Sequence, residues 1–138
     1  MTATRLLREP DSPERSGTPS AKRERSTSEG DEFWLCCAQC GLRVVPSSAI
    51  FRPGAETPLV FANPEGMVFE LVTASRAEGL TFVGPSVSEF SWFAGYAWRV
   101  ALCAGCMSHL GWRYEACFSG VTPAVFFGLR RAALVERR

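Results

Sequence analysis

The stretch that decides the fold is SWFAGYAWRVALCAGCMSHLGWRY, residues 91–114, which holds three of the four tryptophans. Aromatic, β-branched and small residues alternate over residues 98–103, which predicts a strand with Trp98 on one face. A turn between two cysteines follows, and the next expected strand has Trp112 and Tyr114 on one face. Two tryptophan-bearing strands therefore leave one cysteine turn, and their rings form either plain core or the wall of a binding pocket.

Two Cys-x-x-Cys motifs, Cys37 with Cys40 and Cys103 with Cys106, are separated by 62 residues. Each two-residue spacer lets both thiolates face one point, and two such pairs complete a tetrahedral shell, so the pattern predicts zinc. Gly105 permits a left-handed turn that would aim backbone amides at sulfur. A redox motif needs only one pair and disulfides form in oxidising compartments, so both alternatives are disfavoured. Four sulfur ligands close the shell, and we expect one structural zinc per chain.

The other cysteines and the only histidine lie outside this set. Cys36 and Cys117 are expected to be small buried hydrophobic residues. His109 is expected to make a structural hydrogen bond, because the four cysteines already fill the metal shell. The usual acid and base pairs of an enzyme are missing from the central stretch, so we expect no catalytic residues.

The chain has two parts of very different composition. All sixteen aromatic residues lie at Phe33 or later. Residues 1–32 are rich in Ser, Thr, Pro, Gly and mixed charge, and such a segment cannot bury enough apolar surface to offset its chain entropy. We therefore expect a disordered leader over residues 1–32 and one domain over residues 33–138. A domain of this size depends strongly on a metal for stability.

Charge and hydropathy exclude several classes of partner. The leader carries six basic and seven acidic residues and the rest carries nine and seven. Neither part has the positive field that binding to a phosphate backbone needs, so no nucleic-acid partner is expected. The chain start lacks the apolar region of a secretory signal, and no stretch approaches the length of a membrane span. We expect a soluble, cytoplasmic monomer with no membrane partner.

Short apolar runs between Gly and Pro turns predict a mainly β domain. Further strands are expected over residues 43–45, 58–62, 67–74 and 80–83. Asn63 and Pro64 are typical of a turn, since Asn can bond its own backbone and Pro fixes φ. Thr122 and Pro123 are expected to begin one short helix, with the proline at its first turn.

The central stretch resembles the signature of the CULT domain family, which comprises the thalidomide-binding domain of cereblon and stand-alone bacterial relatives. The family pattern reads approximately SWFPGYAW, CxxC, SHxGW and an aromatic residue two positions on. This chain has SWFAGYAW, CAGC, SHLGW and Tyr114, and the match extends to LCCAQC, FANPEG, and TP followed by FFGL. The resemblance covers the chain from about Phe33. It implies a β-tent, in which two antiparallel sheets meet at roughly a right angle and are pinned by a zinc site of four cysteines.

In CULT domains the ligand is a cyclic imide, a glutarimide ring held between three tryptophans and a fourth aromatic residue. The resemblance implies that the corresponding aromatic cage consists of Trp92, Trp98, Trp112 and Tyr114. It also implies backbone hydrogen bonds to the imide from Phe90 and Trp92, and a rim formed by Asn63 and Pro64. An aromatic box buries the methylenes of the ring, and fixed backbone groups match its polar edge.

Three positions depart from the cereblon pattern. Tyr114 replaces a phenylalanine and adds a hydroxyl. Phe90 replaces a histidine whose contact is through the backbone, so little change is expected there. Ala94 replaces a proline, so φ of this bend is no longer fixed.

The leading hypothesis is a non-enzymatic binding module for cyclic imides or uracil-like heterocycles. The alternative is a methionine sulfoxide reductase on the same fold, but the reductase run of Arg, aromatic, Cys, hydrophobic and Asn is absent, since Arg113 and Tyr114 are followed by Glu115. A third hypothesis is recognition of protein C-termini that end in a cyclised imide. No ubiquitin ligase adaptor is expected as a partner, because in cereblon the adaptor binds a Lon-like domain that precedes the CULT domain.

Overall fold

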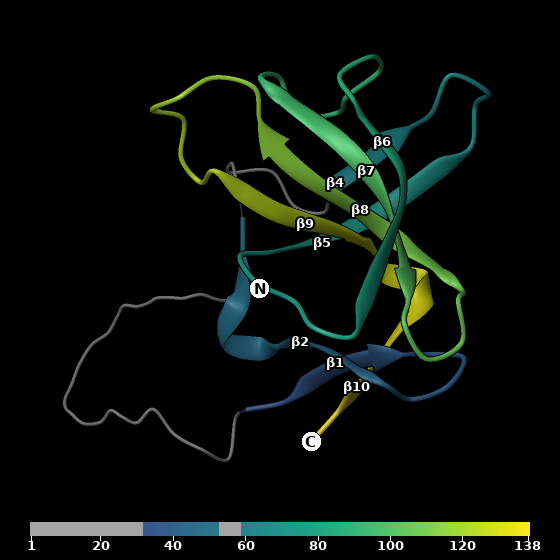
Figure 1. The fold of residues 1–138 in the computed structure, drawn as a ribbon. Helices are drawn as coiled ribbons and strands as arrows, with labels where there is room; N and C mark the ends of the chain where they lie inside the picture. Colours follow the sequence, from purple (N-terminus) through teal and green to yellow (C-terminus); the bar gives the residue numbers. More distant parts are fainter. Residues whose placement is uncertain (1–31, 53–58) are drawn as a thin grey trace, which may run out of the picture. The chain divides into compact units, whose positions relative to one another are not determined.

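The computed structural model describes residues 32–52 and 59–138 (Figure 1). The chain divides into the units Met1–Glu32 and Phe33–Arg138, and the elements below belong to the second. The leader expected to be disordered lies outside the described residues but for its last residue. The strands are β1 (Trp34–Cys37), β2 (Arg43–Pro46), β3 (Ile50–Phe51), β4 (Leu59–Ala62), β5 (Val68–Ala74), β6 (Leu80–Val87), β7 (Tyr96–Cys103), β8 (His109–Ala116), β9 (Val125–Arg130) and β10 (Leu134–Arg137). Two short 3-10 helices are η2 (Ser47–Ala49) and η3 (Arg131–Ala133).

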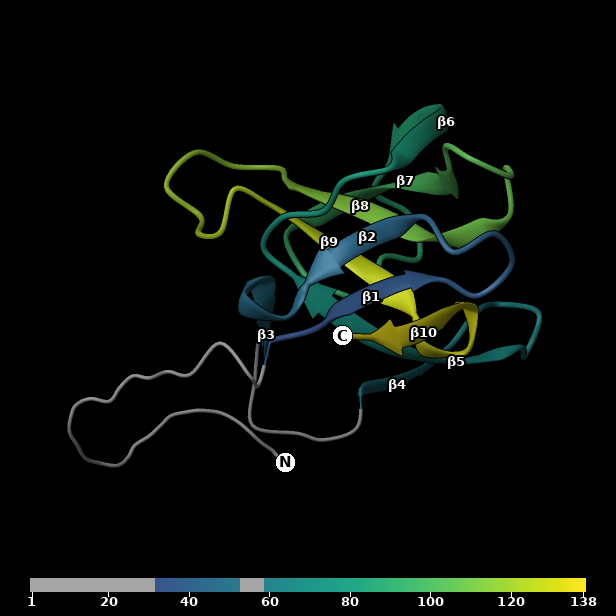
Figure 2. The same ribbon diagram turned by 90° about the horizontal axis from the view of Figure 1, so that it is seen from below.

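Antiparallel pairing joins the described strands into two sheets (Figures 1 and 2). The small sheet has the order β10-β1-β2, and the large sheet has the order β3-β5-β9-β8-β7-β6, with β4 also paired to β5. Cys37 at the end of β1 lies opposite Leu134 of β10, so the small sheet combines strands from both ends of the domain. The expected mainly β fold with two antiparallel sheets is confirmed.

A buried core lies between the two sheets. The small sheet contributes Leu35, Val44, Val45 and Leu134, and the large sheet contributes Ala74, Leu110 and Leu129. None of these side chains is more than 4% exposed. Full burial of a leucine or valine stabilises a fold by about 1.5–3 kcal/mol, so this contact between sheets is a main source of stability. Cys37 and Cys103 belong to the same cluster, which places the cysteine motifs at the edge of the core.

Most expected strands are present, with shifts at their ends. The strand expected over residues 58–62 corresponds to β4, which begins at Leu59. Pro58 lies outside the described residues. The strand expected over residues 80–83 is longer, and β6 continues to Val87. A bulge between Val83 and Val87 accommodates the Gly-Pro pair that had indicated the end of the strand.

The prediction of a short helix beginning at Thr122 and Pro123 is wrong, because the described residues between β8 and β9 form no helix. The N–H of Ala116 donates to the carbonyl of Ala124 at 2.8 Å, and the chain then enters β9 at Val125. The first three residues of β9 are β-branched or aromatic, and β9 pairs with the central strand β8. Pairing across the sheet therefore outweighs the local preference of proline for a first helical turn.

Replacement of Gly111 by alanine is expected to destabilise the domain by about 3 kcal/mol. An added Cβ would lie 2.7 Å from the Cα of Leu129 and closer still to the carbonyl oxygen of Gly128, so β8 and β9 would have to separate. Gly120→Ala is the control, because its Cβ would meet only open space and its φ of 86° adds strain of about 1 kcal/mol. Urea denaturation measures both variants, and equal losses would contradict the close approach.

Candidate metal centre and aromatic cavity

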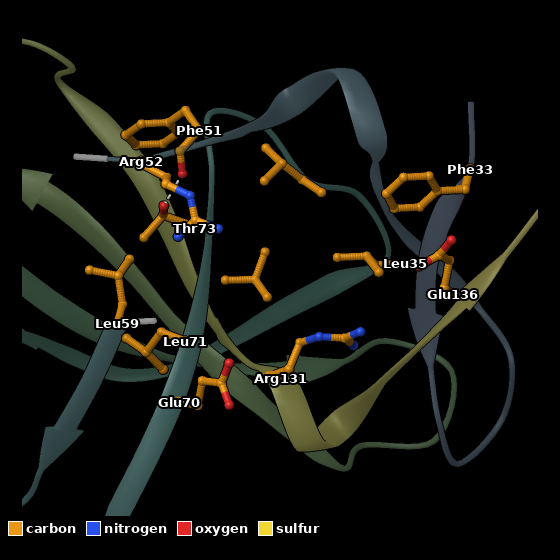
Figure 3. Close-up of a pocket in the computed structure, with 12 residues that line it drawn as sticks. Phe33, Leu35, Phe51, Arg52, Leu59, Glu70, Leu71, Thr73, Arg131 and Glu136 are labelled. Atoms are coloured by element: carbon orange, nitrogen blue, oxygen red, sulfur yellow. Dashed lines mark hydrogen bonds between the residues drawn. The ribbon is translucent and has the colours of Figure 1, made fainter. Parts of the chain in front are cut away.

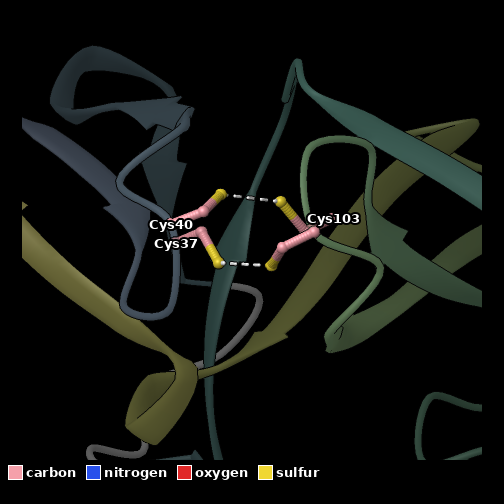
Figure 4. Close-up of side chains that lie close together, drawn as sticks. Cys37, Cys40 and Cys103 are labelled. Carbon is pink, nitrogen blue, oxygen red and sulfur yellow. Dashed lines mark hydrogen bonds between the residues drawn. The ribbon is translucent and has the colours of Figure 1, made fainter.

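Four cysteine side chains meet where the β1–β2 turn faces the β7–β8 turn (Figure 4). The Sγ atoms of Cys37, Cys40, Cys103 and Cys106 all lie within 4.8 Å of one another. Cys37 Sγ lies 3.6 Å from Cys106 Sγ, and Cys40 Sγ lies 3.5 Å from Cys103 Sγ. Zinc–sulfur bonds of about 2.3 Å in a tetrahedron place the sulfurs about 3.8 Å apart. The four predicted ligands are therefore together, at the spacing that a metal ion needs.

Backbone hydrogen bonds shape the second cysteine turn. The N–H of Met107 donates to the carbonyl of Cys103 at 2.7 Å, and the N–H of Gly105 points at Cys103 Sγ at 3.3 Å, as expected. The left-handed residue, however, is Met107 with a φ of 67°, and Gly105 is not left-handed. A Cβ at Gly105 would lie 3.2 Å from Cys40 Sγ. Position 105 therefore favours glycine because a larger residue would crowd the Cys40 sulfur. The prediction that Gly105 is needed for a left-handed backbone is wrong.

The close spacing of the thiols shifts their pKa values in opposite directions. Burial by itself raises the pKa of Cys37, but hydrogen bonds from the Ser108 hydroxyl and the Cys40 amide contribute to lowering it to about 6. At Cys40 the Leu42 amide favours ionisation, yet the neighbouring Cys103 thiol raises the pKa to about 12. Thiolates this close are all ionised together only beside a cation, which is the environment that a divalent metal supplies.

Ser108 also contacts the cysteine cluster, a role that was not predicted from the sequence. Its Oγ lies 3.4 Å from Cys37 Sγ and 3.1 Å from Cys106 Sγ, so it joins the two pairs. Its signal in the sequence is its place as the first residue of SHLGW, directly after the second cysteine turn. His109, next in the chain, is outside the cysteine cluster of the described residues.

His109 has the expected structural role. Its Nε2 lies 3.1 Å from the carbonyl oxygen of Gly111, and its ring meets Trp112 edge-on with centroids 4.9 Å apart. Burial and the nearby guanidinium of Arg130 lower its pKa. The imidazole is therefore neutral at pH 7 and donates to Gly111 through Nε2–H.

The remaining cysteines differ from each other. Cys36 is buried, as expected. Cys117 is exposed in the β8–β9 loop, so the expectation that it is buried is wrong. Its N–H donates to the carbonyl of Gly95 at 2.9 Å, and this backbone bond places the residue on a loop whose side chains face solvent.

All seven residues that the resemblance placed in the ligand site line one cavity of about 390 Å³. The β7–β8 pairing sets Trp98 directly opposite Tyr114, and Trp112 lies two residues earlier on the same face of β8. The other lining residues are Asn63, Pro64 and Glu65 from the β4–β5 turn, and Phe90 and Trp92 from the β6–β7 loop. Glu65 is the one lining residue that was not predicted.

Hydrogen bonds fix the orientation of two indoles. Trp92 Nε1 donates to the carbonyl of Ala62 at 2.9 Å, and Trp98 Nε1 donates to the carbonyl of Glu89 at 2.7 Å. The rings of Trp92 and Trp112 meet edge-to-face, with centroids 5.0 Å apart and planes at 78°. The walls of the cavity are therefore set before any occupant enters.

A second layer of rings supports the cavity and was missed by sequence reasoning. Phe61 stacks on Trp92 with centroids 5.2 Å apart, and Phe69 lies edge-on to Trp112 at 5.4 Å. Phe126 stacks on Tyr114 at 5.0 Å. Phe61 and Phe69 are directly opposite each other in the β4–β5 pairing. Their alternation in the sequence indicated strands, but it did not indicate which rings they would support.

The rim is formed by two turns. Asn63 Oδ1 accepts the N–H of Glu65 at 3.0 Å and that of Met67 at 2.8 Å, so the expected bonding of Asn63 to nearby backbone is confirmed. Phe90 has a φ of 60°, which is uncommon for a residue with a large side chain, and its ring is 69% exposed. Phe90 is therefore an exposed residue at the edge of the cavity.

The bend that contains Ala94 is held without proline. Ser91 Oγ donates to the carbonyl of Phe93 at 3.0 Å, and Tyr96 N–H donates to the same carbonyl at 3.1 Å. Gly95 supplies a left-handed φ of 87°. These bonds restrain the loop at the position where the family pattern has proline.

A second cavity, of about 230 Å³, lies between the two sheets (Figure 3). Leu35 of β1 and Leu71 of β5 form apolar walls, while Glu70, Arg131 and Glu136 add charges of both signs. In Figure 3 the Arg131 side chain extends between Glu70 and Glu136. Among the described residues that line this cavity there is no cysteine and no histidine.

Comparison with known proteins identifies relatives. No family model matches the chain. Protein cereblon of Danio rerio is 38% identical over 103 residues, that of Gallus gallus 37% over 105, and that of Drosophila melanogaster 36% over 104. These matches cover 73%, 75% and 72% of this chain but only 24%, 24% and 17% of the relatives. The chain thus spans a quarter or less of the length of the curated relatives that it matches.

Among the described residues, no helix has the length and apolar character needed to cross a bilayer. The fold of two antiparallel sheets, the four clustered cysteines and the identity to several cereblons over nearly three quarters of the chain agree with one another. The chain is a cereblon homologue and belongs to the CULT domain family that its central stretch resembles.

Proposed function

We propose that the domain is a zinc-stabilised binding module whose aromatic cavity holds a cyclic imide. The observation that carries the proposal is that three tryptophans and Tyr114 line one cavity of about 390 Å³ in a homologue of cereblon. Flat aromatic walls suit the methylenes of a glutarimide or the faces of a uracil-like ring. The volume lies within the range of about 300–1,000 Å³ that is typical of small-molecule sites.

The backbone of the β6–β7 loop would bind the polar edge of the imide. The imide N–H and its two carbonyls each cost about 1–3 kcal/mol if they are buried without a partner. The indole N–H groups of Trp92 and Trp98 already donate to backbone carbonyls, so they are not free for this purpose. The left-handed Phe90 turns the loop backbone at the cavity edge, and strained residues of this kind are concentrated at ligand sites.

We propose binding without catalysis. No cysteine lines the aromatic cavity, and Cys117 is exposed in the β8–β9 loop, so the cavity lacks the reactive thiol that a methionine sulfoxide reductase needs. Four sulfur ligands would leave a zinc ion no open position for water. The two functions proposed for the cysteine site and the cavity are therefore structural support and recognition.

An imide at the end of a protein chain is the second candidate ligand. The rim of the cavity carries exposed Phe90, Pro64 and Glu65, so a substituent on the ring has a path to solvent. A free heterocycle and a C-terminal cyclic imide would place the same ring between the same walls. A peptide with a cyclised C-terminal residue that displaces glutarimide and binds more tightly than glutarimide would indicate a site that also recognises the peptide, whereas equal affinities would indicate a site for the ring alone.

The metal-site prediction is one equivalent of zinc per chain, since tetrahedral sites of four sulfurs favour zinc. Cys103→Ser should lose the metal and most of the folded population, because structural zinc contributes on the order of 10 kcal/mol. Cys117→Ser is the matched control and should retain both metal and melting temperature. Elemental analysis measures the zinc content, and thermal unfolding measures the melting temperature. Less than half an equivalent of zinc, or unaltered melting of Cys103→Ser, would defeat the proposal.

Glutarimide should bind with a Kd between millimolar and micromolar, because about eight heavy atoms contribute roughly 0.5–1 kcal/mol each. N-methylglutarimide should bind at least about tenfold more weakly, since methylation removes the donor to the loop backbone but keeps the apolar contact. Isothermal titration calorimetry gives both constants. Equal affinities would show that only apolar contact operates, and no binding of either would show that the rings serve only as core.

Trp98→Ala should weaken glutarimide binding at least about tenfold, because it removes one wall of the cavity while leaving the cysteine turn in place. Trp34→Ala is the control, since Trp34 lies on β1, with the guanidinium of Arg43 5.0 Å from its ring, and does not line the cavity. Zinc content should be unchanged in both variants. Glutarimide affinities that fall equally in the two variants would indicate a general loss of structure.

A further inference from the structure

Among the side chains of the aromatic cavity, Tyr114 combines a nearly buried ring with a hydroxyl that has no hydrogen-bond partner in the described residues. The hydroxyl oxygen is not fully buried, so it keeps accessible surface where Tyr114 lines the cavity. The side chain is 2% exposed, and its hydroxyl makes no hydrogen bond to a described residue. The indoles of Trp92 and Trp98 bond backbone carbonyls, and the side-chain oxygen of Asn63 accepts two amides. Trp112 also makes no hydrogen bond within the described residues, but its side chain is only half-buried.

The Tyr114 ring cannot turn to find another partner. It stacks on Phe126 with planes at 15° and meets Phe93 edge-on at 4.9 Å. On another side it passes so close to Gly128 that a Cβ there would lie 2.9 Å from Tyr114 Cε2. In a close-packed environment of this kind the direction of the phenol is set by its neighbours. The hydroxyl is therefore a fixed polar group in the cavity wall.

A fixed, unbonded hydroxyl has a cost that phenylalanine avoids. Once a ligand fills the cavity and excludes water, a polar group without a partner costs about 1–3 kcal/mol. Phenylalanine, which the cereblon pattern has at this position, would give the same ring contacts without that cost. Burial raises the pKa of Tyr114, so the phenol keeps its proton at neutral pH. It can accept one hydrogen bond and donate another.

We propose that the Tyr114 hydroxyl is a specificity-determining group that selects cyclic ureides, rings of the dihydrouracil type, over the glutarimide ring. The inference rests on the imide-binding function proposed above and names the ligand class within it. Dihydrouracil and glutarimide have the same ring size and the same imide edge. They differ at one ring atom, where the ureide has N–H and glutarimide has a methylene. The ureide N–H donates to Tyr114 Oη, whereas the methylene leaves that oxygen without a partner.

The test is calorimetric titration of the zinc-loaded full chain with 5,6-dihydrouracil and with glutarimide. The variants are Tyr114→Phe and, as a matched control, Tyr96→Phe. Tyr96 is the only other tyrosine, its hydroxyl donates to the carbonyl of Pro123 at 2.7 Å, and it does not line the cavity. Wild type and Tyr96→Phe should bind dihydrouracil about fivefold more tightly than glutarimide, the effect of one net hydrogen bond. In Tyr114→Phe this ratio should fall to one or below, because the ureide N–H then loses its acceptor in the cavity wall.

Each remaining outcome overturns the proposal. An unchanged ratio in Tyr114→Phe would show that the hydroxyl does not select the ring, although imide binding itself would stand. No binding of either ring to the wild type would instead remove the imide-binding function and the inference with it. Tyr114→Phe should melt no lower than Tyr96→Phe, and a clearly lower melting temperature would reveal a structural partner for the hydroxyl.

Discussion

Two short cysteine turns, one on each sheet, bring four sulfur atoms together at the edge of the core between the sheets. The small sheet consists of three strands of four residues each, which is too little to persist alone. Its apolar face belongs to one buried cluster with residues of the large sheet, and the members of this cluster include Leu35, Val45, Leu110 and Leu129. A metal held by the four sulfurs at the edge of that core would fix the two sheets to each other, and the apolar contact would then become an interaction within one closed unit.

The large sheet has a different task, which is to display rings in a fixed arrangement. Trp98 and Tyr114 face each other across β7 and β8, and a second set of rings lies behind them. Aromatic side chains have few rotatable bonds, so a cavity built from them loses little entropy when a ligand enters. The stiffness of the walls therefore comes from Phe61, Phe69 and Phe126, which do not touch the cavity themselves.

The cluster of four cysteines could be predicted from the residues alone, whereas the cavity required the family resemblance. Spacing is enough for the cysteines because a Cys-x-x-Cys turn is a local structure. The supporting phenylalanines depend on the β4–β5 register and on packing between distant strands, which composition and alternation do not encode. The exposure of Cys117 could not be predicted for a similar reason, since it depends on the path of the β8–β9 loop, whose backbone bonds to Gly95. The helix predicted at Pro123 does not form, because pairing of β9 with β8 outweighs the preference of proline for a first helical turn.

The β7–β8 hairpin carries a cysteine pair at its turn and two walls of the cavity along its strands. Because side chains alternate across a sheet, a slip of one residue in this pairing would move Trp98 and Tyr114 to opposite faces and also shift Cys103 away from Cys40. Correct pairing of the hairpin is thus a condition for gathering the four cysteines, and a metal bound by them would favour the correctly paired hairpin over its alternatives. Such a metal would stabilise the register of the strands that line the aromatic cavity without lying in the cavity itself.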